Sequence, residues 1–161
     1  MKNLFTTLCL TTLVSACSPS DGKYQTKATS VSAVTMTENM SFETVEENLR
    51  QALQKRDLKL FTVVDHGEGA ESVGMDIGQS KLFIFGNPKS GTPLMVANRE
   101  MGVELPMKIL IFENGRGEIG LRRTDIKALA AQYDLTDQEK RIQKIDMTLN
   151  AISEEAVSGS Q

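Results

Sequence analysis

The sequence predicts an α+β domain in which helices pack on a mostly antiparallel sheet. Apolar residues recur at helical spacing in four segments and alternate or run together in others, so the chain mixes helices with strands. The strands and helices do not alternate regularly, as a parallel sheet would require. Near the end of the chain, Asn114-Gly115 lies between two apolar runs and predicts a hairpin, which pairs its strands antiparallel.

The first predicted elements are a short strand and an amphipathic helix. Residues 31–37 alternate weakly and predict an edge strand. Ser41 then precedes a segment whose apolar residues share one face, so we expect it to cap a helix that begins at Phe42. Glutamates near the start of this helix and Lys55 and Arg56 near its end fit the helix dipole.

The middle of the chain predicts two strands that flank a glycine-rich loop. Residues 58–65 are rich in β-branched and aromatic residues, as strands are. Residues 66–80 contain four glycines and predict a loop with a short helical turn near Ala70. Residues 81–85 form a nearly continuous apolar run, which is typical of an inner strand buried on both faces.

The second half predicts a helix, a hairpin and two more helices. Thr92-Pro93 fits a capping residue followed by proline at the first helical position, and Gly102 fits the end of that helix. The hairpin strands are expected at 107–112 and 118–123, and the next helix at Thr124. The last helix is expected to begin with a capping box and to carry an apolar stripe; these residues are Thr136, Glu139, Ile142, Ile145, Leu149 and Ile152.

The N-terminus has the pattern of an export signal that ends at a cysteine. Residues 1–16 carry one positive charge, an apolar stretch of signal-peptide length, and small residues directly before Cys17. Leu13 to Cys17 resembles a bacterial lipobox, in which the cysteine is acylated after cleavage and anchors the protein to the membrane. The alternative is an ordinary signal peptide with a chance cysteine. Residues 17–30 are polar and predict a flexible tether behind the lipidated Cys17.

The composition and the predicted anchor restrict the function classes. Ser18 follows Cys17 and resembles the sorting pattern for the outer membrane on its periplasmic side. The chain has a formal net charge of −3 and no basic cluster, so a nucleic acid is not an expected partner. Once the signal is removed, Cys17 is the only cysteine and its sulfur carries the lipid. We therefore expect no cysteine metal site and no cofactor.

The segment Phe85 to Met95, FGNPKSGTPLM, is the first candidate site. Asn87, Lys89 and Thr92 lie between a predicted strand and a predicted helix N-terminus, where an anion is favourable. Its spacing differs from that of a phosphate-binding P-loop, and proline removes one backbone donor. The more economical interpretation is a turn with a helix cap.

His66 is the second candidate and the only histidine. It follows Asp65 at a strand end and precedes the glycine-rich loop, a position that suits proton transfer or metal binding. Neighbouring residues in a strand point to opposite faces, so Asp65 is not automatically its partner. A structural histidine is the simpler interpretation. The sequence contains no hydrolase or nucleotide motif, so no catalytic residue is assigned.

Several ordered segments resemble the domain-of-unknown-function 302 (DUF302) family. The most specific are Asp65-His66 followed by Gly69-Ala70, Phe85 to Pro88, and Gly91 to Met95. The resemblance implies a two-layer α+β domain of the TATA-binding-protein-like type, with helices on one face of a curved antiparallel sheet. It also implies homodimers in some members and no established activity.

The resemblance divides the chain into a DUF302-like domain at 31–135 and a C-terminal helical extension at 136–161. We expect a lipid-anchored envelope domain that binds a small molecule or a protein partner near His66, Asn87, Lys89 and Thr92. Two alternatives stay open: an enzyme or a haem or metal protein that uses His66, and a structural lipoprotein whose last helix packs on another chain.

Overall fold

A five-stranded antiparallel sheet forms the framework of the protein. The computed structural model describes residues 34–37 and 39–158 of the 161. The predicted signal segment and Cys17 therefore lie outside the described residues. The strand order is β1-β5-β4-β3-β2, and every neighbouring pair is antiparallel. The strands are β1 (Thr35–Thr37), β2 (Lys59–Asp65), β3 (Ser80–Gly86), β4 (Met107–Glu113) and β5 (Ile119–Arg123).

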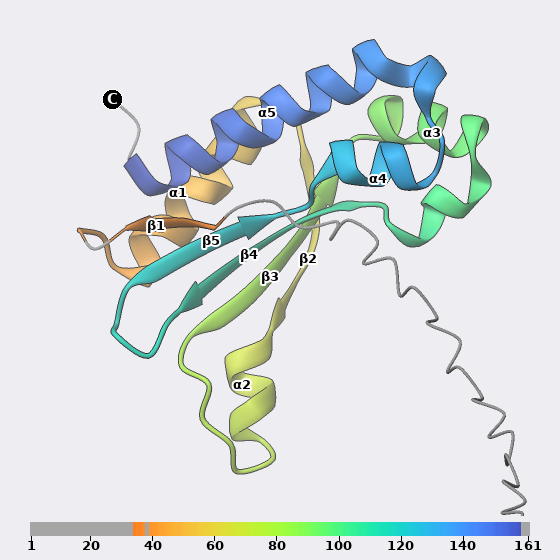
Figure 1. The fold of residues 1–161 in the computed structure, drawn as a ribbon. Coiled ribbons are helices and arrows are strands. Elements are labelled where there is room, and N and C mark those ends of the chain that lie inside the picture. Colours follow the sequence, from red (N-terminus) through yellow and green to blue (C-terminus); the bar gives the residue numbers. More distant parts are fainter. Residues whose placement is uncertain (1–33, 38, 159–161) are drawn as a thin grey trace, which may run out of the picture.

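Helices α1 and α5 lie together over one face of this sheet, and α2 projects from one end of it (Figure 1). The α+β class with an antiparallel sheet is therefore confirmed. The α-helices are α1 (Phe42–Lys55), α2 (His66–Glu71), α3 (Pro88–Ala97), α4 (Ile126–Gln132) and α5 (Glu139–Ser158). Two 3₁₀-helices, η1 (Arg99–Val103) and η2 (Thr136–Gln138), connect them.

The elements with the strongest local signals form as predicted. The Ser41 side chain accepts a hydrogen bond from the Thr44 amide at 3.2 Å and caps α1, whose predicted apolar face is buried. Asn114 and Gly115 lie in the turn between β4 and β5, where the Asn114 amide donates to the Glu118 carbonyl at 2.9 Å. β1 is an edge strand, as expected, and is three residues long in the described part of the chain.

Three predicted helix starts are wrong. α4 begins at Ile126, with Asp125 as its cap, and not at Thr124. α3 begins at Pro88 and not after Thr92, because Asn87 supplies the cap and Pro88 the first helical residue; Pro93 lies inside the helix. The expected capping box at Thr136 does not form either. Thr136 lies in η2, which has no side-chain cap, and α5 follows from Glu139.

The core lies between the sheet and the helices. α5 contributes side chains to the same apolar cluster as α1 and the strands, and these are Ile142, Leu149, Ile152 and Ala156. The structure consequently has no break in packing at 135/136, where the sequence analysis placed the start of an extension. Among the described residues, no helix combines the length and the apolar character that crossing a membrane requires.

Candidate functional site: the cleft between α3 and α5

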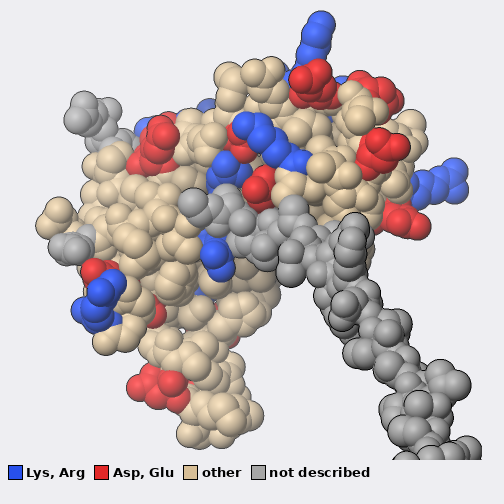
Figure 2. Space-filling model, viewed as in Figure 1, with Lys and Arg blue, Asp and Glu red and all other residues tan. Residues whose placement is uncertain are grey.

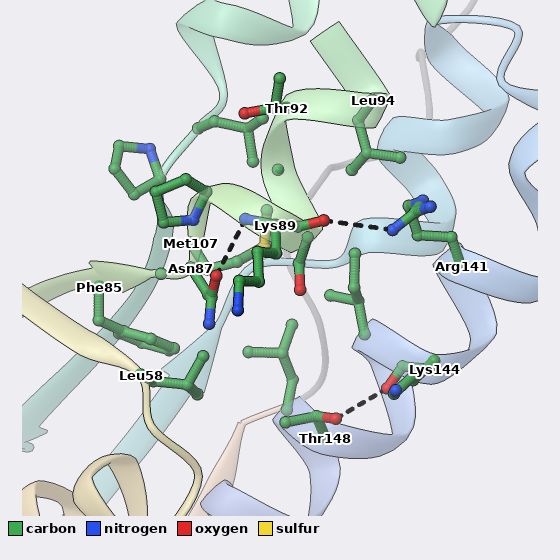
Figure 3. A pocket seen from close by; sticks show the side chains of 18 of the residues that line it. Leu58, Phe85, Asn87, Lys89, Thr92, Leu94, Met107, Arg141, Lys144 and Thr148 are labelled. Atoms are coloured by element: carbon green, nitrogen blue, oxygen red, sulfur yellow. Dashed lines mark hydrogen bonds between the residues drawn. The ribbon is translucent and has the colours of Figure 1, made fainter. Parts of the chain in front are cut away.

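A cleft of about 590 Å³ lies where the ends of β2, β3 and β4 meet α3 and α5. Its volume falls within the range of roughly 300–1,000 Å³ that is common for small-molecule sites. Its walls are mostly apolar and come from the strand ends, from α3 and from α5 (Figure 3). The apolar lining includes Leu58, Phe85, Leu94, Leu105, Met107 and Ile145.

The first turn of α3 forms one rim of the cleft. The Asn87 side chain accepts a hydrogen bond from the Lys89 amide at 2.9 Å, and the Asn87 carbonyl accepts from the amides of Ser90 and Gly91. Pro88 has no amide hydrogen to donate. The donors at this helix start are thus occupied within the chain, which favours the turn and cap over a phosphate loop.

Pro93 leaves one carbonyl of α3 available to another helix. In a regular helix the amide of residue 93 would donate to the carbonyl of Lys89, four residues earlier, but proline has no amide hydrogen. Instead, Nη1 of Arg141 on α5 donates to the Lys89 carbonyl at 3.4 Å (Figure 3). This hydrogen bond connects the two helices at the rim of the cleft.

One face of α5 forms the opposite wall. Arg141, Lys144, Ile145, Thr148 and Leu149 all line the cleft. Their spacing of three, one, three and one residues places them on a single side of a helix. The sequence analysis missed the polar members of this set. Their position beside the apolar stripe of the same helix is visible in the sequence, but it does not show which element they face.

The charges that line the cleft have one sign. Lys89, Lys140, Arg141 and Lys144 line it, and no aspartate or glutamate is among its described lining residues. None of the ion pairs formed among the described residues includes a residue of this cleft. Asp137 and Glu139 line shallower grooves beside the cleft. The cleft thus combines an apolar interior with four cations that have no carboxylate partner in the described chain.

The structure brings together three of the four predicted ligand-binding residues. Asn87, Lys89 and Thr92 all line the cleft, Asn87 as the cap and the other two from α3. His66 lies elsewhere. It begins α2 directly after Asp65, which pairs with Lys81 at the start of β3, whereas the cleft lies at the Gly86 end of that strand. A strand of this length spans roughly 20 Å, so the structure does not bring His66 and the α3 loop together in one site.

The surroundings of His66 also differ from those of a proton-transfer pair. Its side chain is exposed, and Oδ1 of Asp65 accepts a hydrogen bond from the Glu68 amide at 2.9 Å and caps α2. Oδ2 of Asp65 lies 3.8 Å from Nζ of Lys81. Within the described ranges, no group of three histidine, cysteine, aspartate or glutamate side chains is placed to hold a metal ion.

Comparisons with known proteins identify relatives and a shared fold. A family model described as "Domain of unknown function DUF302" matches residues 33–155, which includes most of α5. The crystal structure of an uncharacterized conserved DUF302 protein from Bacillus stearothermophilus has a TM-score of 0.69 at 16% identity and covers 80% of this chain and 99% of that one. At 16% identity, the similarity between the two structures shows a shared fold and nothing further.

Curated relatives share sequence over part of their length. Proteins named "Fluoride-specific ion channel FluC 1" from Brucella suis and Brucella abortus are 39% identical over 93 residues, or 58% of this chain. The match spans 36% and 34% of these two proteins. The chain thus spans about a third of the length of the curated relatives it matches, and the channel name describes those proteins.

Proposed function

Because the chain belongs to the DUF302 family, whose function is unknown, we propose a function from the geometry of the cleft: the protein binds a small, largely apolar molecule between α3 and α5. The observation that carries the proposal is the mostly apolar cleft of about 590 Å³. Large apolar pockets with a few polar groups are the usual form of small-molecule sites. His66, which lies at the other end of the sheet, has no role in this proposal.

A tryptophan introduced into the cleft tests this binding. Thr148 lines the cleft from α5, and Thr148→Trp would fill part of its volume. We expect the full-length protein to bind the neutral dye Nile red, and Thr148→Trp to weaken that binding by about tenfold or more, because the dye and the indole compete for the same apolar space. Thr148→Phe, with a smaller ring, serves as a second variant, and thermal melts establish that each variant is folded.

The matched control is Met147→Trp. Met147 is the adjacent residue of α5, but its side chain is 61% exposed and does not line the cleft. This variant adds the same indole on the solvent side and should bind Nile red like the wild type. Failure of the wild type to bind the dye, or equal binding by the folded Thr148→Trp protein, would contradict the proposal.

We propose further that the domain is held at the cell envelope through a lipid on Cys17, with outer-membrane sorting on the periplasmic side. The support is the lipobox-like sequence that ends at Cys17 and the Ser18 that follows it. Labelling cells with radioactive palmitate should mark the wild-type protein and place it in the membrane fraction. Cys17→Ser should lose both the label and the membrane association, and persistence of either would overturn the assignment.

A homodimer is an additional proposal, and the exposed side of the sheet offers the surface for it. Met36 and Val64 lie on the edge strands β1 and β2, are 41% and 39% exposed, and do not line the cleft. Sedimentation of the full-length protein should show twice the mass of the chain. A monomer at all concentrations would remove this proposal without affecting the cleft.

A further inference from the structure

We infer that the ligand of the cleft is an anionic amphiphile, a molecule with an apolar tail and a single carboxylate or phosphate head. This inference rests on the proposed function and specifies the chemical class of the ligand. It comes from the division of the lining residues into an apolar interior and a cationic rim. The apolar interior alone would not select between a neutral and an acidic ligand, and the cationic rim alone would not require an apolar tail.

The apolar interior accounts for the tail. Phe85, Leu94 and Met107 are nearly or fully buried members of the core that also line the cleft. Leu58 and Leu105 are partly buried beside them. A hydrocarbon chain placed against these side chains would be removed from water, and this removal is the main source of affinity for apolar groups. Few polar contacts would be lost in the process.

The cationic rim accounts for the head. Arg141 and Lys144 come from one side of the cleft and Lys89 from the other (Figure 3). Lys140 also lines the cleft. The planar guanidinium of arginine offers paired donors that match the two oxygens of a carboxylate or phosphate. Arg141 already donates to the Lys89 carbonyl at 3.4 Å and to Oε1 of Gln138 at 3.3 Å, so its guanidinium is held at the rim.

The cleft differs from the rest of the described chain in gathering several cations without a carboxylate at one place. Seven other cations of the described chain are engaged by carboxylates; these are Arg50, Lys55, Arg56, Lys81, Arg116, Arg123 and Lys127. The four cations of the cleft have no such partner among the described residues. Four other described cations also lack one, but none of them lines the cleft; these are Lys59, Arg99, Lys108 and Arg122. Like charges gathered at one rim repel one another, so an anionic head would remove an unfavourable interaction as well as form favourable ones.

Displacement of Nile red by amphiphiles with the same tail and different heads tests the inference. Dodecanoate, dodecyl phosphate, dodecanol and dodecylamine are compared with the full-length protein, below the concentrations at which they form micelles. We expect one or both anions to displace the dye at concentrations at least about tenfold lower than dodecanol does, with dodecylamine weakest. Added salt should reduce this advantage, because salt screens charge interactions.

The two anionic probes distinguish two sources of the head group. Preference for dodecanoate would support a free fatty acid, and preference for dodecyl phosphate would support a ligand derived from a phospholipid.

The double variant Arg141→Gln and Lys144→Gln isolates the rim. It should lose most of the preference for the anions while dodecanol displaces the dye as it does in the wild type. The matched control is the double variant Arg99→Gln and Arg122→Gln. It also removes two positive charges, but from exposed positions that do not line the cleft. This control should keep the preference, and thermal melts verify that both proteins are folded.

The outcomes separate this inference from the proposed function. Equal displacement by dodecanol and by the anions would overturn the anionic ligand and leave the apolar site intact. Loss of the preference in the control variant would also overturn it, because the effect would then come from net charge. Absence of Nile red binding by the wild type would instead overturn the proposed function itself.

Discussion

Asp146 is the only charged residue that is buried in the described part of the chain. Its carboxylate lies 2.9 Å from the Arg123 guanidinium of β5 and 2.6 Å from Nζ of Lys127 on α4. Burial alone would raise the pKa of Asp146, but the hydrogen bonds from Lys127 and Arg123 outweigh it and hold the pKa below its usual value. Asp146 thus fastens α5 to β5 and to α4.

Replacing Asp146 by asparagine should destabilise the protein by about 3 kcal/mol, because the Arg123 side chain, which is only 11% exposed, loses its carboxylate partner. The guanidinium of Arg123 keeps its hydrogen bonds to Asn150 and to the Thr124 carbonyl, which limits the loss. Urea unfolding measures the difference. Glu154→Gln, at an exposed position of the same helix, is the control and should change the stability by less than about 0.5 kcal/mol.

The stability difference between wild type and Asp146→Asn should depend on pH. Because the pKa of Asp146 is lower in the folded state, its contribution is fully present above the unfolded pKa and is lost as pH falls through the folded pKa. We therefore expect a constant difference near neutral pH that narrows in the acid range, below the ordinary carboxyl pKa of 3.8. A difference that widens there would contradict this assignment.

At the scale of elements, α2 and the loop after it form a lobe that projects from the sheet. In the view of Figure 2 this lobe, at the bottom, shows mostly uncharged surface. Val73, Met75 and Ile77 in the loop are 67%, 65% and 52% exposed. The loop returns toward the start of α2, since a Cβ on Gly67 would lie 2.9 Å from the Gly78 carbonyl oxygen.

Two glycines of α2 should respond oppositely to alanine. Gly67→Ala would place its Cβ against the Gly78 backbone and should destabilise the protein by about 1–2 kcal/mol. Gly69 has open space around the same position, so Gly69→Ala should be neutral or stabilise by up to about 1 kcal/mol through helix propensity. Thermal unfolding compares the pair, and equal effects would refute the close approach of the loop.

Local sequence signals predicted an element correctly where the chain offers only one strong candidate for its cap or its turn. Ser41 had no rival as the cap of α1, and Asn114-Gly115 had none as the hairpin turn. Around α3, in contrast, Asn87-Pro88 and Thr92-Pro93 both combine a capping residue with proline, and local sequence does not rank them. The structure uses the first pair, so Thr92 becomes a helical residue that lines the cleft.

At the scale of the whole molecule, the site residues that the sequence did not predict are brought to the cleft by packing between distant segments. Asn87, Lys89 and Thr92 are close together in sequence, and their polar character marked them. Arg141 and Lys144 lie about fifty residues away, and only the placement of α5 over α1 and beside α3 brings them to the cleft. No periodicity within α5 reveals which helix it faces, which is why the prediction stopped at a C-terminal extension.

Removing α5 should therefore unfold the domain. Burial of each large aliphatic side chain contributes about 1.5–3 kcal/mol, and α5 buries Ile142, Leu149 and Ile152. Their combined loss rivals the total stability of a typical domain, about 5–15 kcal/mol. A chain that ends at Leu135 should show no cooperative thermal transition, whereas one that ends at Ser158 should melt like the full-length protein. A cooperative transition without α5 would show that the helix is dispensable.

Pro93 influences how α3 and α5 are joined at the rim of the cleft. Because proline frees the Lys89 carbonyl, the rim is joined across α3 and α5 by the side-chain hydrogen bond from Arg141, which is long at 3.4 Å. Such a bond contributes roughly 0.5–1.5 kcal/mol, so breaking it is a frequent thermal event. If the cleft binds the proposed ligand, exchange through this side would require no unfolding of either helix, and the residence time would depend on the ligand's own contacts.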